Sequence, residues 1–363
     1  MKKGNKDLLG RAGEFLAEIQ TLAQSPFNIM EVCGTHTVAI AKNALRELLP
    51  TSIRLISGPG CPVCVTNSSD IDRYLYLAAQ PKVITATFGD MIRVPGTEKT
   101  LQILRAEGAD VRIVYSTQDA LELAHKNPDK EVAFLGIGFE TTTPTVALSI
   151  EAAKQEGITN YSVLSMHKVV PPVLRLLAEA EELVVDAFLD PGHVCAIIGT
   201  EPLEFMAKEY GLPGVITGFS ALDILEAIVM LLRQRAEGRS EIEIQYKRVA
   251  KAQGNPHAKR VVERVFEPVD ASWRGIGLIR NSGLVIREEY GAWDAVRKFE
   301  LPVFHSPETP GCRCGDVLKG LIYSTECPLF GKRCTPMKPV GPCMVSSEGS
   351  CAAYYQYVQR SVN

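Results

Sequence analysis

Residues 131–157 read EVAFLGIGFETTTPTVALSIEAAKQEG, and this stretch shows the local pattern that decides the fold. Its apolar start, residues 131–137, is typical of a short buried strand. The turn that follows carries threonine hydroxyls and Pro144, which are suited to cap a helix. Strand, turn and helix in this order predict one unit of a parallel α/β sheet.

The same unit recurs along much of the chain. Short β-branched runs, each followed by a turn and a helical stretch, favour parallel strands joined by right-handed crossovers. Eight such units could close a single barrel. The polar, glycine-rich motifs fall into two groups, however, which favours two open four-stranded sheets that face each other across a cleft. The expected strands are residues 28–32, 54–57, 83–87, 111–116, 131–137, 161–166, 187–190 and 214–217.

A chain of 363 residues is long enough for two or three domains that each bury a core. The predicted boundaries are 28–127 for a first α/β domain, 128–236 for a second and 237–363 for a third, cysteine-rich domain. Within the third domain, residues 241–265 are expected to be helical and residues 275–286 to form a short hairpin. The N-terminal helix, residues 1–27, is expected to pack on this third domain.

Charge and composition exclude several classes of protein. A net charge of −3 gives no reason to expect nucleic acid or an anionic membrane as partner. The N-terminal region lacks the unbroken apolar core of a signal peptide, and the most apolar helix, residues 221–232, is too short to span a bilayer. The chain is therefore expected in the cytoplasm, where clustered cysteines serve metals or catalysis more often than disulfides.

Cys33 and His36 follow the first expected strand, in the motif Cys33-Gly34-Thr35-His36. A cysteine at a strand-to-helix turn lies near the helix N-terminus, whose partial positive charge favours thiolate. His36 is near enough in sequence to act as a base or a second ligand. The alternative is a buried cysteine beside a threonine that caps the helix.

Cys61 and Cys64 follow the second expected strand, in a loop made rigid by glycine and proline. The C-x-x-C spacing allows a reversible disulfide or a shared metal ion. Reactive or redox use is favoured over half of a structural zinc site.

Other polar residues also follow expected strands, where ligands bind in open α/β sheets. Asp90 and Glu140 are candidates to line the cleft. Nucleotide binding near Glu140 is disfavoured because Thr141 replaces the third glycine of a dinucleotide motif. No Walker loop, nucleophile elbow or H-E-x-x-H helix is present in the sequence, which disfavours ordinary kinase and hydrolase chemistry. Weaker candidates are His167, Asp190, His193 and Cys195.

Six of the ten cysteines lie close to the C-terminus, with one, twelve, six, eight and seven residues between successive ones. Structural zinc sites usually use paired C-x2-4-C knuckles, and this run has none, so the spacing favours an iron–sulfur domain over a zinc site. Either metal site needs four ligands, which leaves two thiols, enough for one disulfide. These cysteines are Cys312, Cys314, Cys327, Cys334, Cys343 and Cys351.

These motifs together resemble the HypD family, the maturation factors of [NiFe]-hydrogenases. The likeness extends from about residue 28 to the C-terminus, with the motifs in the family's order and no departure at the cysteine positions. The motifs that carry it are Cys33-Gly34-Thr35-His36, Gly58-Pro59-Gly60-Cys61-Pro62-Val63-Cys64, Gly89-Asp90-Met91, Gly138-Phe139-Glu140-Thr141-Thr142 and the C-terminal cysteine run.

The resemblance implies a three-domain α/β scaffold that works with a small HypC-type partner. By this resemblance the pair would hold one iron while two cyanides and one carbon monoxide are attached. A HypE-type partner carries the cyanide, and the Fe(CN)2CO unit then passes to the hydrogenase large subunit. Soft thiolate donors suit low-spin iron with such ligands.

The resemblance also implies roles for individual cysteines. Cys33 would bind the assembly iron, with His36 beside it and the Cys61/Cys64 pair near the same cleft. The C-terminal domain is similar to the cluster region of ferredoxin–thioredoxin reductase, where a [4Fe-4S] cluster adjoins a redox-active disulfide. By that likeness the cluster ligands are Cys312, Cys327, Cys334 and Cys351, and the disulfide joins Cys314 and Cys343.

Two other functions remain open from the sequence. One is a stand-alone thiol–disulfide oxidoreductase that uses Cys61, Cys64 and the cluster. The other is an interaction module stabilised by zinc. The Cys33-Gly34-Thr35-His36 motif favours the scaffold, because a simple reductase would not require it.

Overall fold

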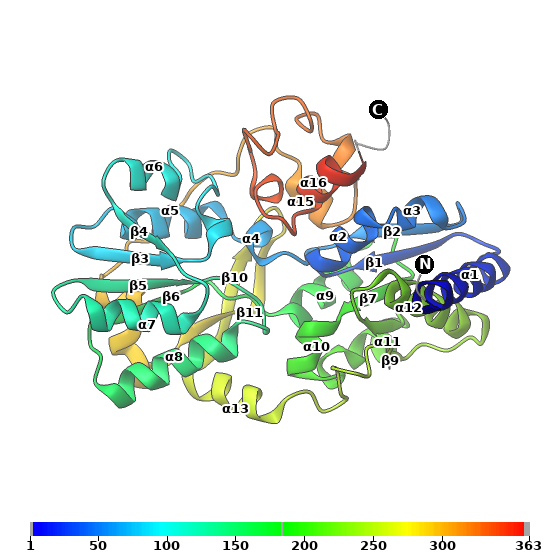
Figure 1. Ribbon diagram of the computed structural model, residues 1–363, viewed down its shortest axis with the longest axis horizontal. Coiled ribbons are helices and arrows are strands. Elements are labelled where there is room, and N and C mark those ends of the chain that lie inside the picture. Colours follow the sequence, from blue (N-terminus) through cyan, green and yellow to red (C-terminus); the bar gives the residue numbers. More distant parts are fainter. Residues whose placement is uncertain (1–2, 183, 359–363) are drawn as a thin grey trace.

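Two parallel sheets make up most of the molecule, with a β-hairpin between them and the cysteine-rich tail over their junction (Figure 1). The structure is a computed structural model, which describes residues 3–182 and 184–358. Strands β3 (Val83–Thr87), β7 (Ala187–Pro191) and β8 (Gly214–Thr217) are buried along their whole length, as expected for parallel sheets that helices cover on both faces.

The first sheet has five strands in the order β2-β1-β7-β8-β9. Its strands are β1 (Phe27–Glu31), β2 (Ile53–Ser57), β7 (Ala187–Pro191), β8 (Gly214–Thr217) and β9 (Ile242–Ile244). The helices in this part of the chain are α1 (Lys3–Leu22), α2 (Gly34–Lys42), α3 (Leu45–Leu48), α10 (Gly192–Ile198), η2 (Glu201–Leu203), α11 (Glu204–Tyr210) and α12 (Ala221–Ala236).

The second sheet has four strands in the order β4-β3-β5-β6. Its strands are β3 (Val83–Thr87), β4 (Asp110–Ile113), β5 (Glu131–Gly136) and β6 (Tyr161–Ser165). The helices here are α4 (Pro62–Val65), α5 (Ser68–Ala78), η1 (Gly89–Met91), α6 (Leu101–Ala106), α7 (Thr117–Lys126) and α8 (Thr143–Glu156). The next helix, α9 (Val170–Glu179), follows β6 in the chain but lies in the lobe of the first sheet, against α11 (Figure 1). The helix α7 begins with a capping box, in which Ser116 and Asp119 satisfy each other's backbone N–H groups.

All eight predicted strands are present, but the chain divides them between the sheets differently from the prediction. The expected boundary near residue 127 would put β1 to β4 in one sheet. Instead β1 pairs with both β2 and β7, with Ile29 opposite Leu55 and Ala187. The chain leaves the first sheet after β2, builds the second, and returns. Local patterns specify that a segment is a strand, whereas packing between distant segments selects its partners.

The remaining elements join the two sheets and form the tail. The hairpin consists of β10 (Phe266–Trp273) and β11 (Gly277–Ile286), so residues 275–286 supply only its turn and second strand. The segment 241–265 is helical only from Pro256, because it starts with β9 at the edge of the first sheet. The other elements are α13 (Pro256–Val265), η3 (Glu288–Trp293), α14 (Ala295–Lys298), α15 (Cys314–Leu318), η4 (Ser324–Glu326), η5 (Pro342–Met344), α16 (Ser350–Ala353) and η6 (Tyr354–Val358).

The N-terminal helix does not pack on the cysteine-rich tail as predicted. It lies along α12 of the first sheet (Figure 1), where Ile19 is fully buried in the same core as Ile228. Arg233 Nε also donates to Glu18 Oε1 at 2.7 Å. The apolar stripe of α1 therefore covers a face of α12 that would otherwise be exposed to solvent. Within the described residues, no helix combines the length and apolar character needed to cross a membrane.

Candidate functional site

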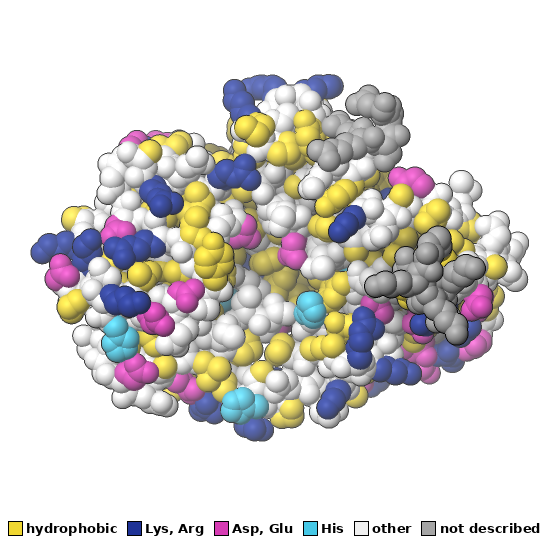
Figure 2. Space-filling model, in the orientation of Figure 1, with side chains coloured by type: hydrophobic (Ala, Val, Ile, Leu, Met, Phe, Trp, Pro, Cys, Tyr) yellow, Lys and Arg dark blue, Asp and Glu magenta, His cyan; other side chains and the backbone are white. Residues whose placement is uncertain are grey.

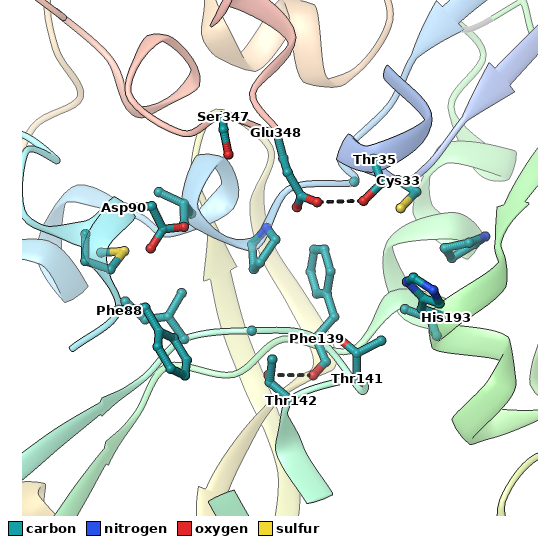
Figure 3. Close-up of a pocket in the computed structure, with 18 of the residues that line it drawn as sticks. Cys33, Thr35, Phe88, Asp90, Phe139, Thr141, Thr142, His193, Ser347 and Glu348 are labelled. Atoms are coloured by element: carbon teal, nitrogen blue, oxygen red, sulfur yellow. Dashed lines mark hydrogen bonds between the residues drawn. The ribbon is translucent and has the colours of Figure 1, made fainter. Parts of the chain in front are cut away.

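A cavity of about 530 Å³ lies where the carboxyl ends of strands from both sheets meet the tail (Figure 3). The loops after β1, β3, β5 and β7 each contribute to its wall, as expected for the ligand-binding edge of parallel sheets. Figure 2 shows acidic side chains and a histidine around a hollow in the middle of this face. Its polar and sulfur-bearing lining residues include Cys33, Thr35, Asp90, Thr141, Thr142, His193, Ser347 and Glu348.

Cys33 is the only cysteine among the described residues that line this cavity. It stands at the N-cap of α2 and is held there by two close backbone contacts. A Cβ on Gly60 would lie 2.2 Å from the Cys33 nitrogen, and a Cβ on Gly34 would lie 2.5 Å from the Glu348 carbonyl oxygen. Both positions therefore need glycine, because the loops after β1 and β2 and the tail meet through their backbones.

The surroundings of Cys33 favour the protonated thiol by raising its pKa, contrary to the thiolate expected at a helix N-terminus. Burial, followed by the nearby Glu348 carboxylate, raises the pKa of Cys33 to about 12. Backbone N–H groups of Thr35 and His36 act in the opposite direction, as the helix argument requires, but they are outweighed. A metal ion that binds this sulfur must therefore displace a proton.

Glu348 is the residue of this cavity that the sequence analysis missed. Thr35 Oγ1 donates a hydrogen bond to Glu348 Oε1 at 2.6 Å, which ties the tail to the start of α2 (Figure 3). The sequence does hold a signal for it, because Glu348 is the only charged residue between the last two cysteines, Cys343 and Cys351.

The histidine at the cavity is His193 rather than His36. His36 is fully buried, and its Nε2 donates to the carbonyl oxygens of Thr217 and Gly218 at 3.3 and 3.0 Å. Burial lowers the pKa of His36 to about 4, so the ring is neutral. Its ring stacks on Phe219, and the ring of His193, which lines the cavity, contacts Phe219 in a tilted arrangement. His36 thus supports the wall, and His193 faces the space.

The two carboxylate candidates, Asp90 and Glu140, differ in whether they line the cavity. Asp90 lines the cavity, and partial burial raises its pKa. Glu140 is not among the lining residues; its Oε1 accepts from the Val170 backbone N–H at 2.8 Å, at the start of α9. Burial raises the pKa of Glu140 to about 7. Glu140 therefore holds the start of α9 in place behind the cavity and does not face a ligand inside it.

Cys61 and Cys64 lie behind the Cys33 loop, at the start of a row of thiols. The two sulfurs are 2.7 Å apart, and both side chains are buried. Cys64 is in side-chain hydrogen-bond contact with Cys343, and Cys343 with Cys314. Cys61, Cys64, Cys343 and Cys314 thus form a continuous row from the loop after β2 into the tail.

The six tail cysteines surround one small, enclosed space of about 20 Å³, together with Leu329 and Phe330. Cys351 lies near Cys312, Cys327 and Cys334, whose charges add to burial in raising its pKa to about 12. Over residues 3–182 and 184–358, no three His, Cys, Asp or Glu side chains are arranged as a metal site, and all ten cysteines are free thiols. Cys314 and Cys343, the pair expected as a disulfide, are two thiols in contact.

A model of the family described as "HypD: Hydrogenase formation hypA family" matches residues 11–358. The chain belongs to the HypD family. A hydrogenase maturation factor HypD from Rhodobacter capsulatus is 45% identical over 97% of this chain and 95% of that protein. The HypD of Escherichia coli is 44% identical over 97% and 95% of the two chains. A putative hydrogenase expression/formation protein of Methanocaldococcus jannaschii is 43% identical over 91% of each.

The weaker candidates of this HypD-family chain lie away from the cavity, apart from His193. Asp190 and Cys195 are fully buried, and neither oxygen of Asp190 has a hydrogen-bond partner among the described residues. His167 lines a second cavity, under the hairpin. The first cavity is thus lined by one thiol, one imidazole and two carboxylates, but among the described residues no three of these side chains are arranged together as a metal site.

Proposed function

We propose that this chain is an assembly scaffold for the Fe(CN)2CO unit of [NiFe]-hydrogenases, and that it holds the iron at Cys33 together with a HypC-type partner. The relatives named as hydrogenase maturation factors support a role in hydrogenase maturation. The position of Cys33 carries the proposal for the site, because among the described residues it supplies the only thiol of a cavity built from both sheets and the tail.

The residues around Cys33 match the needs of this cargo. Iron replaces the thiol proton, and Glu348, which disfavours the lone thiolate, then stabilises the bound cation. His193 and Asp90 line the other walls and are positioned to orient the diatomic ligands or their donor. A cavity of about 530 Å³ leaves room for a side chain of the HypC-type partner and for the cyanide-bearing thiol of a HypE-type donor.

We further propose that Cys312, Cys327, Cys334 and Cys351 hold a [4Fe-4S] cluster. These thiols surround one enclosed, largely apolar space, and the Val340 backbone N–H points at the Cys334 sulfur at 3.4 Å, a contact that stabilises sulfur ligands of such clusters. When bound, the cluster supplies electrons one at a time. Four thiolate donors match the usual ligand set of such a cluster.

The row of thiols would pass these electrons toward the Cys33 loop. A Cys61–Cys64 disulfide is reduced when the Cys343 thiolate attacks Cys64, which forms a mixed disulfide and frees Cys61. Cys314 then attacks Cys343 and frees Cys64. Two electrons and two protons move to the Cys61/Cys64 pair, and a Cys314–Cys343 disulfide remains to be reduced through the cluster.

Replacing Cys33 tests the scaffold directly. The Cys33→Ala chain, coproduced with its HypC-type and HypE-type partners and purified without oxygen, should lack the cyanide and carbonyl infrared bands and their iron. The visible absorption of the cluster should remain. Cys195→Ala is the matched control, because Cys195 is buried and does not line the cavity. Infrared bands that persist in Cys33→Ala would exclude this site.

A stand-alone thiol–disulfide oxidoreductase is the second candidate, favoured by the 2.7 Å separation of Cys61 and Cys64. The burial of both sulfurs argues against it, because an external disulfide must reach the attacking thiolate. Rapid reduction of a small disulfide by the isolated chain, without any partner, would support this alternative.

A further inference from the structure

A second cavity, of about 730 Å³, lies apart from the one that contains Cys33. It is enclosed by the start of α5, the β10–β11 hairpin in the middle of Figure 1, and residues 303–308. Its volume is that of a site for a metabolite-sized ligand. The proposed scaffold function uses none of its residues.

The floor of this cavity holds buried polar groups with unused hydrogen-bonding capacity. His167 and Lys168 both line it and are only 1% and 3% exposed. The Nε2 atom of His167 has no hydrogen-bond partner among the described residues, and neither does the Nε atom of Arg73. Buried polar groups are normally paired, so a set of such groups in one cavity indicates that a ligand completes them.

The charges favour an anion at this floor. Lys168 and Arg73 share a single carboxylate, that of Asp70, at 3.5 and 3.6 Å, which is longer than a good charged hydrogen bond. Glu308, at the rim, is half exposed and is 3.6 Å from Arg274 behind the wall. Asp270, also at the rim, is exposed and accepts from the Asn281 backbone N–H. Two cations, Lys168 and Arg73, therefore lie on either side of one anion, Asp70.

Apolar side chains also line this cavity. Met166, Trp273, Leu278 and Phe304 line the cavity together with the polar floor. We propose that this cavity binds a small organic anion, whose carboxylate or phosphate lies between Lys168 and Arg73 and whose organic part packs against Trp273. The proposal stands independently of the scaffold function.

The site is connected to the Cys33 cavity through one pair of rings. Trp273 stacks on Phe139, with the ring centroids 5.9 Å apart, and Phe139 lines the Cys33 cavity. The backbone N–H of Arg274 donates to the Val65 carbonyl oxygen, next to Cys64. Only the Phe139 ring would therefore separate a ligand on Trp273 from the Cys33 cavity. The residue after Trp273, Arg274, is hydrogen-bonded to the chain beside Cys64.

Calorimetric titration of the intact chain with phenyl phosphate, benzoate and benzyl alcohol tests the proposal. The two anions should bind saturably and benzyl alcohol should not; the tighter anion identifies phosphate or carboxylate as the preferred group. Lys168→Met should weaken binding of that anion at least about tenfold, through loss of a charged hydrogen bond. Lys126→Met, on the surface beside Glu122, is the charge-matched control and should bind as before.

Glu308→Gln gives an independent arm that does not alter the buried floor. It removes a negative charge from the rim and should tighten anion binding a few-fold. The proposal is overturned if neither anion binds saturably, or if benzyl alcohol binds as tightly as the anions. It is also overturned if affinity does not weaken in folded Lys168→Met, or, where that variant does not fold, if Glu308→Gln leaves affinity unchanged.

Discussion

Thr35 donates its hydroxyl hydrogen to Glu348 at 2.6 Å across a separation of 313 residues, and this bond joins the loop that bears Cys33 to the cysteine-rich tail. The carboxylate so held is also the charge that most disfavours the Cys33 thiolate, after burial. The tail therefore does more than carry sulfur: it sets the electrostatics of the site where we place the iron.

Glu348→Gln should make Cys33 more reactive. Glutamine can still accept the Thr35 hydrogen bond, but it removes the charge that raises the pKa of Cys33. The thiolate fraction should therefore rise, and alkylation of Cys33 by iodoacetamide, followed by peptide mass spectrometry, should be several-fold faster. An unchanged or slower rate in the folded variant would show that Glu348 does not act on this thiol.

Gly34→Ala should destabilise the protein, because the new Cβ would lie 2.5 Å from the Glu348 carbonyl oxygen and would push the tail away. We expect a loss of about 1–3 kcal/mol in the free energy of unfolding, measured in urea. Gly13→Ala in α1 is the matched control: a Cβ there meets no atom within 4 Å, and the change should stabilise by about 0.5–1 kcal/mol. Equal effects of the two changes would contradict the close contact.

Asp190→Asn should stabilise the protein at neutral and higher pH. Burial raises the pKa of Asp190 from 3.8 to about 7. Between these values the unfolded chain has lost the proton and the folded chain keeps it, so the free energy of unfolding falls as pH rises and levels off above about pH 7. At about pH 8 the amide should add roughly 2 kcal/mol or more relative to its effect near pH 4.

Asp223→Asn is the control of opposite sign for this experiment. Burial alone would raise the pKa of Asp223, but hydrogen bonds from Arg248 and Ser220 lower it well below its usual range. That carboxylate stabilises the fold at neutral pH, and its contribution disappears as pH falls through the lowered pKa. Its amide variant should therefore lose stability at about pH 8 and show a smaller loss in acid.

A mixed disulfide should be trapped in the thiol row. A Cys61→Ser, Cys314→Ser double variant keeps the contact between Cys64 and Cys343. It removes the other thiol partner of each of these two residues. Mild oxidation should join these two, and a peptide that contains both should appear in mass spectra and disappear on reduction. Oxidation that instead leaves Cys64 and Cys343 free would contradict the row.

The tail cysteines should fall into two groups. Cys351→Ser should abolish the visible absorption of the anaerobically purified protein, because Cys351 lies with Cys312, Cys327 and Cys334. Cys343→Ser should keep that absorption, because Cys343 belongs to the row that includes Cys64. The reverse pattern would exchange the assignments of ligand and relay thiol.

The sequence alone specified eight of the strands of the two sheets, and the loops that carry chemistry. Each strand is a short run of apolar and β-branched residues, a local property that a single sequence displays. Because ligand sites gather at the carboxyl ends of parallel strands, the same reading found Cys33 and Asp90, which line the cavity. The sequence also showed the six-cysteine run, because a high density of cysteines along the chain can be recognised without knowledge of the fold.

Tertiary structure decided what those elements meet. It paired β1 with β7, placed α1 on α12, and brought Glu348 to Cys33. The tertiary structure also buried His36 behind the cavity wall and placed His193 at the cavity, although His36 is nearer to Cys33 in sequence. The physical reason is that strand and turn propensities act over a few residues. Pairing, burial and the pKa of a thiol depend on surfaces that come together from distant parts of the chain.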